Sequence, residues 1–247
     1  MRGHWSLLLA TCVVAAVPSA HLAAQKDTPP PLDAASAAEL SRLESLVAAS
    51  PDSMRTGAIY RRLVIATWQH NRAYKFFDRL VRQHPSSANL LITAALARVD
   101  QLPRVSIMNQ VSLGRKIIDL ATRSIELRPY WAAFLARGRV YSGFKQVVST
   151  GNRGVKDLEK ARQLYRTAKP CVLQVQIFIT LGDAYWMDRR QADARRVWHE
   201  GLEAFPNTPP LVERLSATDE RIAKLVSYTF SPWRRADTGT SAPCEDE

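Results

Sequence analysis

The stretch Leu181–Pro206 reads LGDAYWMDRRQADARRVWHEGLEAFP, and its spacing decides the fold. At fixed intervals it carries small residues, aromatic residues and a proline: Gly182, Tyr185, Ala194, Trp198 and Pro206. These residue types form no catalytic or metal-binding pattern at that spacing. Small side chains at Gly182 and Ala194 would let two helices cross closely, and the aromatic rings would fill the adjoining space. Pro206 would stop the second helix, so the stretch predicts a helical hairpin that must stack on neighbours.

Prolines recur along the rest of the chain at similar intervals. Prolines stand at positions 51, 85, 129, 170 and 206, which gives gaps of 34, 44, 41 and 36 residues. A period of 20–50 residues is typical of solenoid proteins, which stack one supersecondary unit on the next. The first gap has the length of the 34-residue unit, and the longer gaps indicate the same unit with insertions.

Together these residues resemble the tetratricopeptide repeat (TPR). The pattern is strongest in the fourth unit, around Gly182, Tyr185, Ala194, Trp198 and Pro206. Weaker copies supply Ala73, Phe77 and Pro85 in the first unit, and Gly138, Tyr141 and Ala161 in the third. The resemblance implies an all-α fold, a right-handed superhelical solenoid of antiparallel helix pairs. It implies about four repeats, with a capping helix at 36–49 before the array and a closing helix at 209–227 after it.

The N-terminus has the order of a secretory signal. A basic start precedes the apolar run Leu7–Val17, which small residues follow up to Ala24. The chain therefore divides into a signal peptide (1–24), a flexible leader (25–35), the helical solenoid (36–228) and a disordered C-terminal tail (229–247). Cleavage is expected near Ala24, with Ala20 as second choice and a retained anchor as the alternative. The protein then resembles exported bacterial members of the TPR family, located in the periplasm or at the envelope.

The net charge of the chain restricts the kinds of partner that it can bind. The formal net charge is +11, which suits an acidic partner, although the arginines are scattered over many predicted helices. Export argues against nucleic acid as a partner, and peripheral association with an anionic membrane surface stays open.

Two of the three cysteines, Cys171 and Cys244, lie beyond the signal segment. An oxidising compartment would allow a disulfide between them, with free thiols as the alternative.

The sequence offers no catalytic or metal-binding motif. The histidines beyond the signal segment, His70, His84 and His199, are not spaced as metal ligands, and the chain lacks HExxH, CxxC and GxSxG. We therefore expect no metal, no cofactor and no enzymatic activity.

The resemblance implies instead that the first helix of each pair lines a concave groove. Transferred by register, the groove positions are Arg55, Arg62, Asn89, Ile92, Arg139, Ser142, Gln176, Asp183 and Trp186. The asparagine–lysine clamp that some family members use for C-terminal carboxylates is not reproduced at the matching positions Arg62, Leu96, Arg139 and Asp183.

The sequence thus favours a non-enzymatic scaffold or adaptor that binds a peptide or partner helix in its groove, with an acidic partner suiting the arginines. Two alternatives stay open. One is an accessory component of a transport or solute-binding complex. The other is a binder of an anionic envelope polymer or lipid surface, whose contacts would be sensitive to salt.

Overall fold

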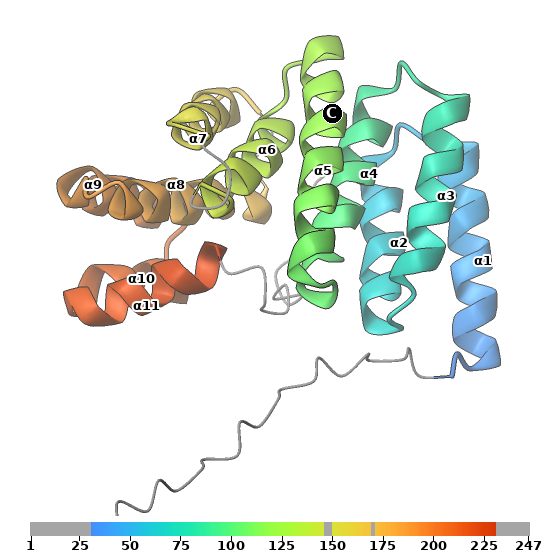
Figure 1. Cartoon of the computed structure of the whole chain (residues 1–247), viewed down its shortest axis with the longest axis horizontal. Helices are drawn as coiled ribbons and strands as arrows, with labels where there is room; N and C mark the ends of the chain where they lie inside the picture. The colour runs from blue at the N-terminus through green and yellow to red at the C-terminus, as the bar shows by residue number, and fades with distance from the viewer. Residues whose placement is uncertain (1–30, 146–149, 169–170, 231–247) are drawn as a thin grey trace, which may run out of the picture.

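The structure is a computed structural model that describes residues 31–145, 150–168 and 171–230. All regular structure in these residues is helical. Its elements are α1 (Ala34–Ala49), α2 (Met54–Ala66), α3 (His70–Gln83), α4 (Ala88–Val99), the 3-10 turn η1 (Leu102–Arg104), α5 (Ile107–Leu127), α6 (Trp131–Gly143), α7 (Arg153–Tyr165), the 3-10 turn η2 (Val172–Gln174), α8 (Val175–Met187), α9 (Gln191–Ala204), α10 (Pro209–Ser216) and α11 (Asp219–Phe230) (Figure 1).

Consecutive helices pack as pairs, which confirms the predicted all-α architecture. The pairs are α2 with α3, α4 with α5, α6 with α7 and α8 with α9, preceded by α1 and followed by α10 and α11. In Figure 1 the helices α1 to α5 run up and down the page, whereas α8 to α11 run across it. The array therefore twists along its length.

Side-chain caps explain where several helices begin. Asp33, Ser53 and Ser87 each accept a hydrogen bond from the backbone N–H three residues later, at 2.8, 3.2 and 3.1 Å. Such caps satisfy N–H groups that have no partner within the helix. Because Asp33 caps α1, this helix begins at Ala34, two residues before the predicted start.

Close approaches between paired helices confirm the packing role of the small residues. A Cβ atom added to Gly182 would lie 2.1 Å from Nε1 of Trp198, across the α8–α9 crossing. At Gly138 it would lie 2.9 Å from the Leu158 side chain, across α6–α7. Any side chain at these positions would force the helices apart.

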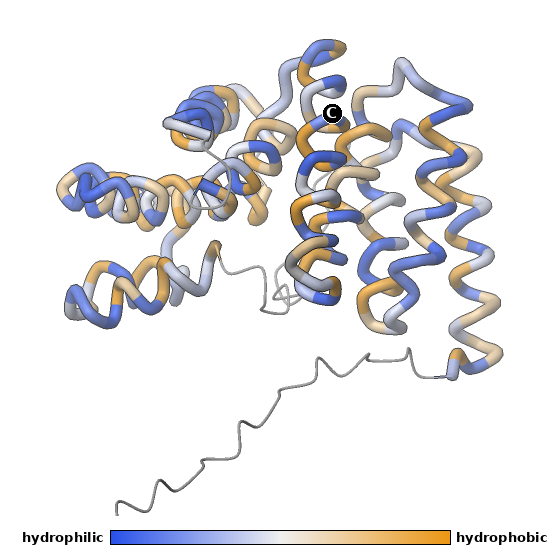
Figure 2. The backbone as a smooth tube through the Cα atoms, in the orientation of Figure 1, coloured by the Kyte–Doolittle hydropathy of each residue, from blue (hydrophilic) through white to orange (hydrophobic). Residues whose placement is uncertain are grey.

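The other signature residues lie where this packing requires them. Phe77, Ala161, Ala194 and Trp198 are fully buried, and Ala73 and Tyr185 are nearly so. Tyr141 is half-buried on α6, and Pro85 and Pro206 lie exposed in the turns that follow α3 and α9. Along outer helices such as α3 and α9, hydrophobic and hydrophilic residues alternate as the helix turns, so that one side packs on the core (Figure 2). In contrast, α4 and α8 are buried on nearly all sides.

The C-terminal part differs from the prediction. The single closing helix expected at 209–227 is two helices, because the backbone of Ala217 is extended and ends α10. The Thr218 carbonyl then accepts the first hydrogen bond of α11, from the N–H of Ile222 at 2.9 Å. The last helix reaches Phe230, so Thr229 and Phe230 belong to the folded array and not to the tail that was expected from residue 229.

Two further boundaries can be compared with the sequence. The 44-residue gap between Pro85 and Pro129 contains the extra turn η1 (Leu102–Arg104), and α5 begins after it, at Ile107. The predicted signal peptide (1–24), most of the leader and residues 231–247 lie outside the described residues. Within the described part of the chain, no helix combines the length and the apolar character needed to cross a membrane.

Candidate functional site

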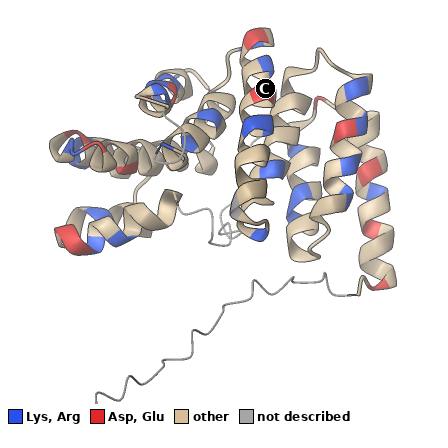
Figure 3. Cartoon of the chain, in the orientation of Figure 1, with Lys and Arg blue, Asp and Glu red and all other residues tan. Residues whose placement is uncertain are grey.

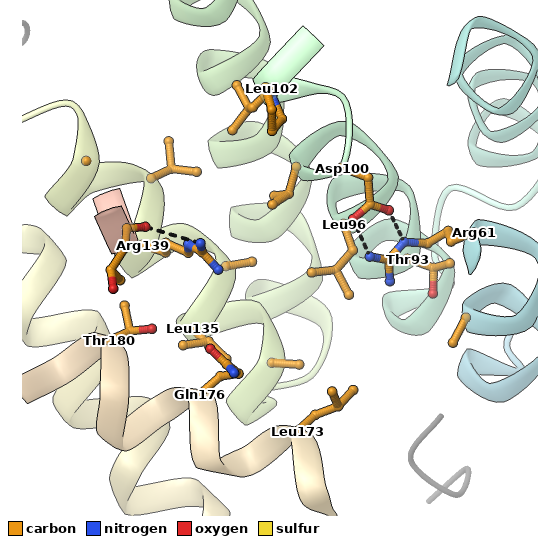
Figure 4. A pocket seen from close by; sticks show the side chains of 18 of the residues that line it. Arg61, Thr93, Leu96, Asp100, Leu102, Leu135, Arg139, Leu173, Gln176 and Thr180 are labelled. Atoms are coloured by element: carbon orange, nitrogen blue, oxygen red, sulfur yellow. Dashed lines mark hydrogen bonds and ion pairs between the residues drawn. The ribbon is translucent and has the colours of Figure 1, made fainter. Parts of the chain in front are cut away.

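The first helices of the four pairs line one hollow of about 270 Å³. Its walls come from α2, α4, α6 and α8, joined by η1, η2 and the end of α11, whereas none of the lining residues that the structure describes comes from α3, α5, α7 or α9. Figure 4 shows the labelled side chains of α4, α6 and α8 around this space. The hollow is therefore on the face of the array that the repeat register predicts as the groove.

The walls of the hollow are mostly apolar. Large apolar side chains line it from every contributing element: Met54, Ile65, Leu96, Val99, Leu102, Leu135, Val140, Phe144, Leu173 and Phe230. Such a surface, with a few polar groups at fixed places, is the usual make-up of a ligand-binding cleft.

Most arginines near the core are neutralised by a carboxylate. In the hollow, Arg61 donates to both oxygens of Asp100, at 2.8 and 2.9 Å (Figure 4). Elsewhere Arg137 does the same to Asp157, at 2.7 and 2.8 Å, and Arg98 pairs with Asp78. Bidentate pairs of this kind fix both side chains and cancel their charges.

Two arginines of the hollow have no such partner. Among the described residues, no carboxylate forms an ion pair with Arg62 or Arg139, and both line the hollow from α2 and α6. Figure 3 shows that basic residues are otherwise spread over most helices and do not form one basic face in this view. The hollow thus holds two cations whose charge is available to a bound molecule.

Arg139 lies in an unusual environment. Its side chain is exposed, but toward the hollow, and its guanidinium group donates to the backbone carbonyl of Thr229 at 3.2 Å. Desolvation by the surrounding protein lowers the pKa of Arg139, while the charges of Asp183 and Asp100 act in the opposite direction. Arginine stays protonated under such shifts, so the hollow presents a positive charge.

Two buried polar groups of the hollow lack hydrogen-bond partners. The Thr180 hydroxyl on α8 is completely buried, and the indole Nε1 of Trp131 on α6 is nearly so. Neither atom has a partner among the described residues. An unsatisfied buried polar group costs folding free energy, and such groups are rare unless a bound molecule or water uses them.

The closing helices cover the fourth unit of the concave face. Asp183, fully buried on α8, accepts hydrogen bonds from Arg214 of α10 at 2.7 and 2.8 Å. The Thr229 hydroxyl of α11 also donates to Asp183, at 2.5 Å. Through this network α11 lies against α8 and α6, and Phe230 enters the lining of the hollow.

The structure brings three of the predicted groove residues together. Arg62, Arg139 and Gln176 all line the hollow. Gln176 is half-buried on α8, one turn before Thr180. Thr180 itself was missed, although its spacing of four residues from Gln176 places both on one face of the helix and could have identified it.

The other predicted groove residues lie elsewhere, and most of them are corrections to the expected surface. Ile92 is fully buried in the core of α4, and Ser142 is buried against Gly154 of α7. Trp186 stacks on Trp198, with ring centroids 5.8 Å apart. Asp183 is occupied by Arg214. These side chains pack between elements instead of facing a partner.

Asn89 and Arg55 also lie outside the hollow. Asn89 is buried, donates to the Asp52 carbonyl at 2.9 Å and accepts from Arg128, so it ties α4 to the loop before α2. Arg55 is exposed on α2 and is not part of the lining.

The structure covers only one of the two cysteines that were predicted to pair. Cys171 takes part in a disulfide bond, but Cys244 lies outside the described residues, so the pairing of these two stays a prediction. Within the described ranges, no group of three or more His, Cys, Asp or Glu side chains is placed to hold a metal ion.

Comparison with known proteins supports the fold. No model of a known protein family matches the chain, and no curated protein matches its sequence. Among solved structures, a thermophilic TPR protein from Thermus thermophilus is similar, with a TM-score of 0.56 and 18% sequence identity. The match covers 77% of this chain and 90% of the other. At this identity the likeness shows a TPR-like fold and nothing about a ligand.

Proposed function

We propose that this protein is a non-enzymatic interaction scaffold that binds an acidic segment of a partner protein along the hollow between α2, α4, α6 and α8. The TPR-like fold supports this proposal, because such arrays offer extended concave surfaces to other proteins. The proposal includes export to the periplasm or envelope, which rests on the N-terminal sequence alone.

One observation carries the proposal. The fold neutralises Arg61, Arg137 and Arg214 with buried or half-buried carboxylates, but no carboxylate of the described residues pairs with Arg62 or Arg139 in the hollow. An aspartate or glutamate side chain of a partner can supply the missing carboxylate, and arginine holds it with two parallel hydrogen bonds. The apolar walls would at the same time bury hydrophobic side chains next to that acidic residue.

The experiment is a crosslinking pull-down with the exported protein in native envelope extract, at low and high salt. The double variant Arg62→Gln/Arg139→Gln removes both free charges of the hollow. The matched control is Arg82→Gln/Arg115→Gln, which removes two exposed charges from α3 and α5, outside the hollow. Both double variants have the same net charge, so only the location of the charges differs.

We expect one stoichiometric protein that survives high salt, that the control variant retains and that the hollow variant loses. An acidic peptide from that protein should then bind the purified scaffold directly. Equal capture by both double variants would contradict binding in the hollow. Acidic material that washes off in salt would instead support the alternative of an anionic polymer or lipid surface, held by net charge.

An accessory role in a transport or solute-binding complex is a second proposal. The apolar lining of the hollow favours it, because a small solute can be enclosed there. Recovery of a solute-binding protein in the pull-down would support this role over a general adaptor.

A further inference from the structure

We infer that the hollow also binds a small amphipathic molecule: an unbranched aliphatic carboxylate, with its carboxylate on Arg139 and its chain against the apolar walls. This inference goes beyond the proposed function, because it concerns a small ligand and does not require a protein partner. It rests on three features of the hollow as the described residues form it: a cation without a carboxylate partner, a buried hydroxyl without a hydrogen-bond partner and a lining with few polar groups.

The head of the ligand is defined by α6 and α8. Arg139 has no carboxylate partner among the described residues, and its remaining N–H groups can donate to a bound anion. The Thr180 hydroxyl, buried and without a partner in the described part of the chain, lines the same space (Figure 4). A carboxylate between them would accept hydrogen bonds from both and would give the hydroxyl a hydrogen-bond partner.

The tail of the ligand is defined by the walls. Leu96 and Leu102 face the hollow from α4 and η1, Leu135 faces it from α6, and Phe144 and Phe230 line it as well. A saturated chain buried against these side chains gains affinity with every methylene that leaves water. No polar atom of such a chain needs a partner.

The scarcity of polar groups favours an aliphatic chain over a peptide in the inner part of the hollow. A peptide backbone carries an N–H and a C=O group in each residue, and each loses its water on burial. The charged pair Arg61 and Asp100 is already satisfied by itself. Apart from Arg139, Thr180 and Trp131, mainly Arg62 and Gln176 remain in the described lining to bond such groups. An aliphatic carboxylate has a single polar group, its carboxylate, and Arg139 can bind that group.

Isothermal titration of the purified protein with hexanoate, octanoate, decanoate and dodecanoate tests the inference, at concentrations below micelle formation. We expect saturable 1:1 binding that tightens about fourfold per added methylene until the walls are filled. Decanol, which has the same chain length as decanoate but no charge, should bind at least tenfold more weakly. Decyl phosphate should bind no more tightly than decanoate; tighter binding would contradict the carboxylate head.

Variants locate the head group. Arg139→Gln should weaken decanoate binding at least tenfold, and the nearly isosteric Thr180→Val should weaken it severalfold. The surface control Arg115→Gln, which lies outside the lining, should leave it unchanged. Circular dichroism and thermal melting check that each variant is folded, and Thr180→Val keeps the test decisive if Arg139→Gln does not fold.

Absence of saturable decanoate binding, or equal binding by Arg139→Gln and the wild-type protein, would overturn the inference. The result does not depend on the proposed function, because the titration contains no partner protein. A failed titration leaves the pull-down result standing and a failed pull-down leaves the titration result standing, so the two proposals fail separately.

Discussion

Asp183 on α8 and Arg214 on α10 form a buried bidentate ion pair, with N–O distances of 2.7 and 2.8 Å. The aspartate side chain is completely buried, and that of the arginine is 5% exposed. This pair and the Thr229 hydroxyl hold both closing helices against the fourth repeat. The position of the closing helices in turn decides where the concave face ends.

Replacing one partner of this pair should be strongly destabilising. Asp183→Asn leaves the Arg214 charge buried and uncompensated, and we expect a loss of about 3–5 kcal/mol in the free energy of unfolding. The double variant Asp183→Leu/Arg214→Met should recover most of this loss, because it removes both charges. Urea denaturation of the wild type, the single variant and the double variant measures the free energy of unfolding of each.

The exposed pair Glu39–Arg42 on α1 is the matched control, with both side chains more than two-fifths exposed. Glu39→Gln should change the free energy of unfolding only slightly, because both charges remain in water. If Asp183→Asn cost no more than this control, the pair would not be what holds the closing helices.

The α8–α9 crossing should tolerate no side chain at position 182. In Gly182→Ala the new methyl group would overlap Trp198, which is fully buried and cannot move aside. We expect a loss of about 1–3 kcal/mol or more in stability, although alanine is the better helix former.

Gly143→Ala provides the comparison for this variant. Its nearest new contact would be the Phe230 carbonyl oxygen at 3.5 Å, an ordinary van der Waals distance. Chemical denaturation should show it to be nearly neutral. A neutral Gly182→Ala would mean that the two helices can separate at little cost.

His70 should make the fold sensitive to mild acid. It is buried at the start of α3, and neither ring nitrogen has a partner among the described residues. Burial and then the charge of Arg104 lower the pKa of His70, while Asp100 opposes them. The unfolded chain therefore binds a proton more readily, and stability should fall as pH drops below about 6.5, by up to about 1.4 kcal/mol per pH unit.

His70→Leu should remove this part of the pH dependence, because leucine does not titrate. His84→Gln serves as control, since His84 is exposed after α3. The free energies of unfolding at pH 7 and pH 5 give the measurement. An unchanged difference between these two values in His70→Leu would show that His70 is not the group responsible.

The cysteine prediction can be checked directly. Peptide mapping of the exported protein without reduction should yield one linked peptide that contains Cys171 and Cys244, and reduction should separate it. A free thiol at Cys171, or its linkage to a cysteine of another molecule, would contradict the intramolecular bond. The test matters for the hollow because Cys171 lies directly before η2, which contributes Leu173 to the lining.

The linear sequence by itself determined the helix pairs. Small residues at Gly182 and Ala194, the bulk of Trp198 and the stop at Pro206 are local signals, because one hairpin contains all of them. The caps Ser53 and Ser87 are equally local. Such short-range patterns fix which residues form a helix and which face it buries.

Which concave positions stay free was decided by the tertiary structure. Repeat register placed Asp183 in the groove, but α11 covers it and Arg214, 31 residues later, neutralises it. No local sequence pattern predicts such a partner, because the pairing depends on how residues 209–230 fold back on the array. The meeting of Arg62, Arg139 and Thr180 around one hollow likewise requires the twist that brings α2, α6 and α8 together.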